Sequence, residues 1–388
     1  MKSKIKVLLL DGYTLQAYSV SKSLKKVGFN VSILTPKKIS YGYFSRFPDR
    51  KIICPDIKQE TLYKKFLIEF LQKNHFDVVL PLFDDSADFL SRHYDEINLY
   101  ARVATMPWKV FVNAANKGQL MELCRQYDIP HPKTYPLHAE GIEEAITYVG
   151  FPSLIKPDYS AGARGIVRVE TEEELRLKVT DALAEYGGVT LQEYVNHSGK
   201  YYNVMLYRNS RGGFEAYTII EIQRYFPLKG GTSSYSITVE NSKLLDISMR
   251  TLDVLNWVGF ADFDFIQDKN TLEYKLIEIN PRIPASIHAA YISGVNFPEI
   301  IVKDLLGLSV PKMNYHAGMK LRYFALDVMW FVFCKDRFKI NPSWFCFWEK
   351  NMRYQDGELS DPLTMICGFL SGVVKYLNPS FRKSKLSK

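Results

Sequence analysis

The first hundred residues alternate short apolar runs with helix-like stretches, and this alternation constrains the fold more than any other feature. Residues 5–10 form a β-type run, residues 16–26 have the pattern of a helix, and residues 31–34 are β-type again. A helix-like stretch, residues 61–73, and another β-type run, residues 76–81, continue the alternation. Strand, helix and strand in succession predict a parallel sheet covered by helices. We therefore predict an α/β chain with a Rossmann-like sheet over residues 1–112.

The rest of the chain divides into two regions of different character. Residues 113–312 mix strand and helix patterns, which predicts an α+β domain. Residues 313–388 are dense in aromatic side chains and end in a basic tail, and we expect a third, mainly helical region there. A chain of 388 residues with 47% hydrophobic residues can build two or three domains with sizeable cores.

Composition argues against several classes of protein. The formal net charge of +8 favours anionic ligands or a membrane surface. The five cysteines are widely spaced and form no CxxC pair, which argues against a disulfide framework or a zinc site. No stretch reaches the roughly 18 apolar residues of a transmembrane helix. We expect a cytoplasmic protein with small-molecule partners and no nucleic acid.

Three hard oxygen donors form the strongest chemical pattern. Alternation along a strand places Glu278 and Asn280 on one face, and a hairpin with the preceding strand would bring Asp264 beside them. Carboxylate and amide oxygens suit Mg²⁺ or Mn²⁺. Arg282, two residues further on, could stabilise a phosphoryl group in transfer. The alternative interpretation is a solvated hairpin with one polar face.

Two lysines and a glycine-containing loop form a second pattern. Lys156 ends a strand and precedes a loop with Ser160, Gly162 and Gly165, while Lys117 begins a helix. A lysine can meet a phosphate as a point charge, and small residues let backbone N–H groups approach it. The loop contains neither a Walker P-loop nor a GxGxxG motif. A plain turn and a solvated lysine are the alternatives.

The order of these elements resembles the ATP-grasp superfamily, carboxylate–amine ligase type, between about Asn113 and Gly307. The resemblance implies that ATP lies between two α+β subdomains. It also implies roles for the residues that match. Those for the nucleotide are Lys117 and Lys156 on the α- and β-phosphates, Ser160, Gly162 and Gly165 in a loop over the triphosphate, and Gln192, Glu193, Tyr194 and Val195 in the hinge that reads adenine.

For the metal and the reacting phosphate, the resemblance implies that Asp264, Glu278 and Asn280 hold Mg²⁺ and that Arg282 meets the transferred phosphoryl group. One position departs from the family pattern. Many members carry a glutamate for the ribose shortly after the hinge, whereas residues 198–203 here contain no acid.

Substrate recognition is predicted for the stretch 223–233. It resembles a substrate loop of amino-acid-type ligases, and Arg224 could bind a carboxylate through two parallel hydrogen bonds. We predict an enzyme that phosphorylates a carboxylate to an acyl phosphate and transfers the acyl group to an amine, releasing ADP and phosphate. The alternatives are a degenerate nucleotide-binding regulatory or scaffold protein, and a Rossmann-type nucleotide-sugar enzyme.

The C-terminal region carries two aromatic clusters, 328–333 and 344–348, an apolar stretch, 365–377, and basic residues at 382–385. This composition is typical of an interfacial anchor. It predicts peripheral contact with the anionic inner face of a membrane, and the alternative is a helical cap on the core. By analogy with the family that the sequence resembles, we expect a homodimer.

Overall fold

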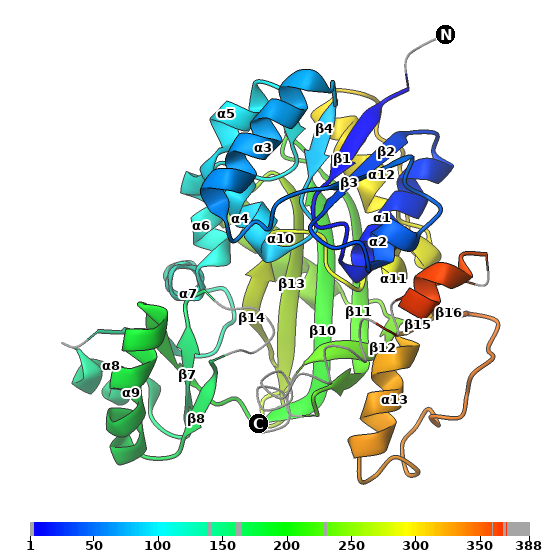
Figure 1. Ribbon diagram of the computed structural model, residues 1–388. Coiled ribbons are helices and arrows are strands. Elements are labelled where there is room, and N and C mark those ends of the chain that lie inside the picture. The colour runs from blue at the N-terminus through cyan, green and yellow to red at the C-terminus, as the bar shows by residue number, and fades with distance from the viewer. Residues whose placement is uncertain are drawn as a thin grey trace.

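The computed structural model describes residues 4–138, 141–159, 165–228, 231–358, 360–367 and 370. The N-terminal part forms the sheet in the upper half of Figure 1. Its five strands are all parallel, in the order β3-β2-β1-β4-β5. The strands are β1 (Lys6–Leu9), β2 (Asn30–Thr35), β3 (Arg50–Ile53), β4 (Val78–Leu80) and β5 (Arg102–Val103). The predicted Rossmann-like sheet is confirmed.

Helices cover this sheet on both faces, which explains why its inner strands are mostly apolar and buried. Val7, Leu8 and Leu9 of β1 are all fully buried. The helices of this part are α1 (Leu15–Lys26), α2 (Tyr41–Phe44), α3 (Glu60–Lys73), α4 (Asp84–Arg92), α5 (Tyr94–Asn98) and α6 (Trp108–Ala115).

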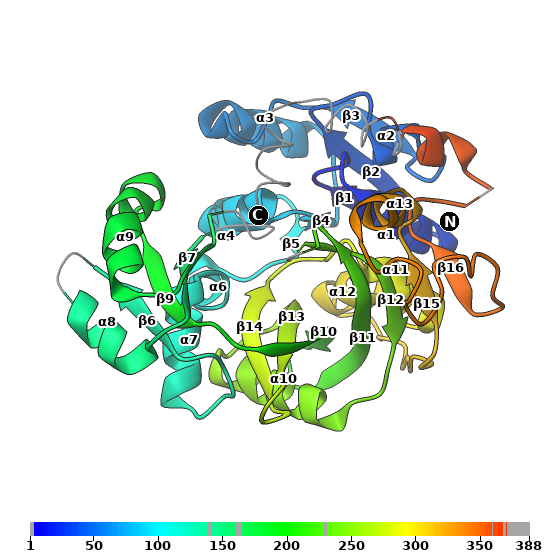
Figure 2. The ribbon, with the colours of Figure 1, turned by 90° about the horizontal axis from the view of Figure 1, so that it is seen from below.

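A small antiparallel sheet follows, at the left of Figure 2. Its strand order is β6-β9-β7-β8. Residues of its strands and of two helices share one buried cluster, which includes Leu137, Ala145 and Leu175. The elements are β6 (Thr134–Leu137), α8 (Ile142–Val149), β7 (Ser153–Pro157), β8 (Val167–Val169), α9 (Glu172–Tyr186) and β9 (Val189–Glu193).

The large sheet has seven strands in the order β14-β13-β10-β11-β12-β15-β16, and it is antiparallel except for the last pair. Its first five strands are β10 (His197–Arg208), β11 (Phe214–Phe226), β12 (Thr232–Thr238), β13 (Gly259–Asp268) and β14 (Tyr274–Asn280). Helices α7 (Lys117–Gln126), α10 (Ser242–Val254), α11 (Ile287–Ser293) and α12 (Phe297–Leu305) belong to this part of the chain.

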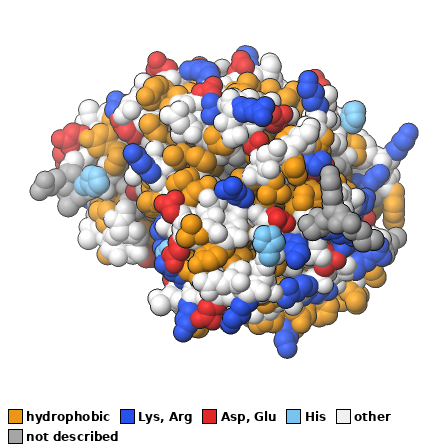
Figure 3. Space-filling model, turned by 90° about the horizontal axis from the view of Figure 1, so that it is seen from above, with side chains coloured by type: hydrophobic (Ala, Val, Ile, Leu, Met, Phe, Trp, Pro, Cys, Tyr) orange, Lys and Arg blue, Asp and Glu red, His pale blue; other side chains and the backbone are white. Residues whose placement is uncertain are grey.

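The N-terminal part and the large sheet share one hydrophobic core. A single buried cluster contains Val31 and Ile33 of β2, Met205 of β10, Ile220 of β11 and Phe297 of α12. The two parts therefore do not pack as independent units, although the sequence divides them near residue 112. The surface seen from above in Figure 3 mixes acidic, basic and hydrophobic side chains.

The C-terminal region extends the large sheet. Strand β15 (Lys320–Arg322) pairs with β12, and β16 (Met352–Tyr354) pairs with β15 in parallel. Helix α13 (Phe324–Phe333) lies between them in sequence, so this region contributes strands as well as helix. The apolar stretch 365–377 is only partly described, and the basic tail lies outside the described residues. In the part of the chain that the structure describes, no helix is long and apolar enough to cross a membrane.

A buried ion cluster holds this region in place. The guanidinium groups of Arg224 and Arg322 both bind the fully buried carboxylate of Asp327. Arg224 Nε and Nη2 donate to Asp327 Oδ1 and Oδ2 at 2.8 and 3.0 Å, and Arg322 Nε donates to Oδ2 at 2.7 Å. Ser234 Oγ donates to Oδ1 at 3.1 Å. Buried charges persist only when they are paired in this way.

We predict that Asp327→Ala destabilises the protein by about 3–5 kcal/mol, because it leaves two buried guanidinium groups without their counter-ion. The midpoint of thermal unfolding would measure the loss. Asp336→Ala, which removes an exposed carboxylate from the same region, is the matched control and should unfold like the unchanged protein. Equal midpoints for the two variants would contradict this role for Asp327.

Candidate active site

The predicted metal ligands meet on the β13–β14 hairpin. The register places Asp264 opposite Glu278 and Asp262 opposite Asn280. Asn280 Nδ2 donates to Asp264 Oδ2 at 3.1 Å, and the Asn203 side chain of β10 donates to Asp264 Oδ1. The strand alternation that the sequence predicts therefore does bring the three oxygen donors to one face.

The electrostatics of this face suit a cation. Burial, together with the neighbouring charges of Glu278 and Asp262, raises the pKa of Asp264 well above its usual value. Burial also raises the pKa of Asp262 to about 8. Asp262 Oδ1 is buried and has no hydrogen-bond partner among the described residues. Several acids close together, one of them with an oxygen that lacks a partner, favour the binding of a cation in addition to the neighbouring basic side chains.

These donors fit Mg²⁺, which keeps substrate phosphates and water among its ligands and needs few protein oxygens. Within the described ranges, no group of three or more His, Cys, Asp or Glu side chains is arranged to hold a metal ion by itself, so an ion here would also depend on the Asn280 amide and on phosphate. Asp264, Glu278 and Asn280 would provide two carboxylates and one amide oxygen, and the remaining positions would be open to phosphate.

The two predicted lysines lie on the same side. Lys117 is the first residue of α7, its backbone N–H donates to Asp158 O at 3.1 Å, and its Nζ lies 3.2 Å from Glu278 Oε2. Burial raises the pKa of Glu278, but the Lys117 ammonium outweighs this effect, with help from Asp264 and Lys156, and the pKa falls to about 2. Glu278 is therefore an anion at neutral pH.

Lys156 is buried at the end of β7, where its Nζ donates to Gln192 Oε1 at 2.9 Å. Burial lowers its pKa to about 8. The carboxylates of Glu278 and Asp264 oppose the shift, and the Lys117 ammonium adds to it. Both lysines therefore lie close to the face formed by Asp264, Glu278 and Asn280, which is called the metal face below after its predicted role.

Arg282 is held from the other side of the site by the N-terminal part. Its Nε and Nη2 donate to Asp84 Oδ1 and Oδ2 at 2.7 and 3.2 Å, and Nη2 also donates to Asn280 Oδ1 at 3.2 Å. Asp84 is the first residue of α4, where the helix dipole favours an anion. Among the described residues, Nη1 has no hydrogen-bond partner, so this end of the guanidinium could bind an incoming anion.

The hinge segment lies at the end of β9. The backbone N–H of Glu193 donates to Lys133 O at 2.8 Å, and that of Tyr194 donates to Pro152 O at 3.0 Å. Because these two N–H groups already have partners, this segment would contact adenine through its carbonyl groups and through Val195. Gln192, the remaining hinge residue, is buried and binds Lys156.

The glycine loop is described only in part. Ser160 and Gly162 lie outside the described residues. Gly165 has φ +73°, and a Cβ there would lie 2.7 Å from the Tyr186 ring. Local packing is thus a sufficient reason for glycine at position 165, and its predicted role in phosphate binding stays a prediction.

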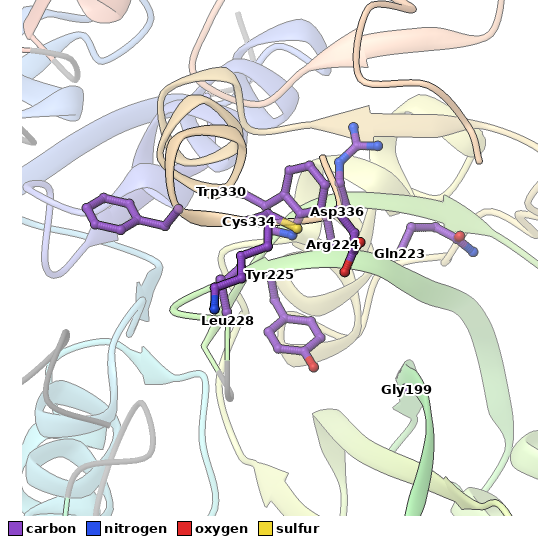
Figure 4. Close-up of a pocket in the computed structure, with 10 residues that line it drawn as sticks. Gly199, Gln223, Arg224, Tyr225, Leu228, Trp330, Cys334 and Asp336 are labelled. Carbon is purple, nitrogen blue, oxygen red and sulfur yellow. The ribbon is translucent and has the colours of Figure 1, made fainter. Parts of the chain in front are cut away.

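Arg224 lies in a different place from the phosphate site. Its guanidinium is buried, with two hydrogen bonds to Asp327, and lies over the rings of Tyr235 and Trp330 at 4.1 and 5.3 Å. It borders a cavity of about 440 Å³ beside α13 (Figure 4). The expectation that Arg224 binds a substrate carboxylate is not supported by this geometry, because a structural carboxylate already occupies its two parallel donors.

A larger cavity of about 730 Å³ opens beside the metal face, with Asp84, Lys117, Glu278 and Asn280 among its lining residues. The N-terminal part forms the opposite wall, which includes Asp11. Burial raises the pKa of Asp11 to about 6, against hydrogen bonds from Ser86 and Leu82. This cavity joins the start of α7 and the end of β14 to the N-terminal part.

Sequence reasoning missed three contributors to the site: Asp262, Asn203 and the pairing of Asp84 with Arg282. Asp262 precedes Asp264 by two residues, so strand alternation could have placed it on the metal face. Nothing in the sequence indicates that Asn203 binds Asp264. Asp84 follows the end of a parallel strand, where ligands usually bind, but its partner is 198 residues away.

Comparison with known proteins agrees with this geometry. Residues 215–326 match a family model described as ATP-grasp in the biosynthetic pathway with Ter operon. The D-aspartate ligase of Enterococcus faecium is 21% identical over 321 residues, which cover 76% of each chain. The carbamoyl phosphate synthase large chain of Clostridium botulinum is 25% identical over 311 residues, which cover 76% of this chain but 27% of that one.

Solved structures share the fold. The N5-carboxyaminoimidazole synthetase of Staphylococcus aureus, complexed with ADP, superimposes with a TM-score of 0.64 at 16% identity, over 81% of both chains. The architecture, the constellation of lysines and carboxylates and the family match agree. The family match over residues 215–326 and the similar ligases support an ATP-grasp fold of the carboxylate–amine ligase type for this chain.

We predict that the affinity for Mg²⁺·AMP-PNP weakens as pH rises through about 8, because Lys156 then loses the charge that meets the phosphates. The dissociation constant, measured by calorimetry, should be roughly fivefold to tenfold larger at pH 9 than at pH 7. The effect on stability has the opposite sign. A buried lysine whose pKa is lowered disfavours the folded state when charged, so the ligand-free protein gains stability as its lysine deprotonates.

Lys156→Met should bind more weakly at neutral pH and lose this pH dependence, while Lys178→Met, on the exposed face of α9, should keep the full profile. An unchanged profile in Lys156→Met would assign the titration to another group.

Proposed function

We propose that this protein is an ATP-dependent ligase that phosphorylates a carboxylate and transfers the resulting acyl group to an amine, with release of ADP and phosphate. The observation that carries the proposal is the convergence of Lys117, Lys156 and Arg282 on the face formed by Asp264, Glu278 and Asn280. Three cationic side chains beside three side chains with oxygen ligands for a metal ion are suited to bind a triphosphate together with a divalent ion.

The residues of the site would have different roles in binding and catalysis, according to their positions. Lys117 and Lys156 would bind the inner phosphates, and Asp264, Glu278 and Asn280 would hold Mg²⁺, which neutralises charge on the phosphates when it is bound. Arg282 would meet the phosphoryl group in transfer through Nη1, while Asp84 holds its other edge. Positioning and charge stabilisation supply most of the rate enhancement in this chemistry.

The reacting carboxylate and amine would enter the cavity of about 730 Å³ between the metal face and the N-terminal part. An acyl phosphate formed there would be partly enclosed, which favours attack by a bound amine over attack by bulk water. A degenerate nucleotide-binding protein is disfavoured because the metal and phosphate positions all keep charged or polar side chains. The cytoplasmic location and the homodimer stay predictions of the sequence.

We expect Glu278→Gln to lower ADP release about a hundredfold or more, because the amide keeps the shape of the side chain but not its charge. The assay is ADP release from Mg²⁺·ATP with pooled carboxylates and amines. Glu273→Gln, at the turn of the same hairpin, should keep full turnover. Turnover that survives Glu278→Gln would remove Glu278 from the metal site, and no binding of ATP to the unchanged protein would remove the proposed function.

We expect Asp84→Asn to lower kcat about tenfold with little change in the KM for ATP. The neutral amide would hold Arg282 less firmly, and this would weaken the stabilisation of the transition state of phosphoryl transfer rather than the binding of ATP. Asp84→Glu should recover part of the rate. In an Arg282→Lys background, Asp84→Asn should cost little more, since both changes act on one interaction. Asp95→Asn, in α5, is the control. Fully additive losses would show that Asp84 does not act through Arg282.

A further inference from the structure

The C-terminal region exposes several large apolar side chains within residues 332–348. Val332 and Phe333 end α13, and Phe338, Phe345 and Trp348 follow in the segment that leads to β16; these five residues are called the aromatic surface. Trp348 is 92% exposed, Phe338 70% and Phe345 56%. Single exposed apolar residues are ordinary, but a group that includes a nearly free tryptophan marks an interaction surface.

The aromatic surface is presented by an ordered support. Arg322 Nη2 donates to Trp344 O at 2.9 Å and Nη1 to Cys346 O at 3.2 Å, while Trp344 Nε1 donates to Asp327 O at 3.1 Å. The buried ion cluster thus fixes the backbone on either side of Phe345. Phe338 and Phe345 also stack on each other, with ring centroids 6.3 Å apart and planes 17° apart. The exposed rings are therefore held outward by the fold.

Basic side chains are interleaved with these rings. The segment 332–353 contains five basic residues and two acidic ones. Lys339 is almost fully exposed, and the Arg337 guanidinium lies 5.2 Å from the centre of the Phe338 ring. Of the acids, Asp336 lies 3.5 Å from Lys339 and Glu349 is paired with Lys320, so Lys335, Arg337, Lys350 and Arg353 provide the excess of positive charge. An excess of positive charge therefore surrounds the exposed rings. The basic residues are Lys335, Arg337, Lys339, Lys350 and Arg353.

This charge decides between partners. In a symmetric pair of copies the same patch would face itself, so the basic side chains would oppose each other across the interface. An anionic lipid surface offers the complementary charge, and tryptophan and phenylalanine are side chains that enter the headgroup region. Each basic residue near such a surface adds further attraction.

We propose that the aromatic surface docks this protein peripherally on an anionic membrane, with Trp348, Phe338 and Phe345 entering the headgroup region and the surrounding lysines and arginines facing the lipid phosphates. The inference is independent of the catalytic proposal, because none of these residues lines the metal face.

Flotation of the full chain with vesicles tests the proposal. Vesicles of equimolar phosphatidylglycerol and phosphatidylcholine should carry the protein upward, and vesicles of phosphatidylcholine alone should carry much less. Added salt should weaken the binding because it screens the charges. The triple variant Phe338→Ser, Phe345→Ser and Trp348→Ser should lower the partition coefficient by about tenfold or more.

The matched control replaces three exposed leucines elsewhere, Leu62→Ser, Leu99→Ser and Leu177→Ser, and should float like the unchanged protein. Unfolding midpoints would confirm that both triple variants are folded. A charge variant, Lys335→Gln with Arg337→Gln and Lys339→Gln, should bind more weakly and depend less on salt.

Three results would overturn the proposal: no flotation of the unchanged full chain, equal flotation with both kinds of vesicle, or unchanged flotation of the aromatic variant. A dimer in sedimentation that dissociates in the aromatic variant would assign the surface to a second copy of the chain instead.

Discussion

The register between β13 and β14 is the constraint on which the site depends. Side chains alternate between the two faces of a strand, so a shift by one residue would turn Glu278 and Asn280 away from Asp264. The observed pairing sets Asp264 opposite Glu278, and the hydrogen bonds from Asn203 and Asn280 fix the orientation of the Asp264 carboxylate. The lysines at 117 and 156 then have a defined negative face to approach.

The second constraint is the core shared by the N-terminal sheet and the large sheet. One hydrophobic cluster joins β2 to β10 and β11. A second buried cluster contains Ala87 of α4 together with Leu276 and Ile279 of β14, and it holds the start of α4 beside the end of β14. This arrangement lets Asp84 reach Arg282 with two hydrogen bonds. Arg282, which we propose meets the transferred phosphoryl group, is thus positioned by the N-terminal part of the chain.

Local patterns in the sequence predict much of this structure. Strand alternation predicted the hairpin and its face of oxygen donors, and the strand–helix order predicted the parallel N-terminal sheet, because both signals depend on neighbours within a few residues. Contacts over long sequence distances were not predictable. Arg224 was expected to meet a substrate, yet it binds Asp327, which lies 103 residues away. Which acid pairs with which arginine depends on packing that periodicity does not encode.

Strands β15 and β16 also protect the sheet. They cover the edge of β12, whose backbone N–H and C=O groups would otherwise be free to pair with another chain. The C-terminal region therefore moves this edge of the sheet from β12 to the short strand β16. Shortening the chain before β15 would expose the edge of β12 and would remove Arg322 and Asp327, which leaves the buried Arg224 without its counter-ion. The segment that carries the exposed rings is thus connected to the integrity of the sheet.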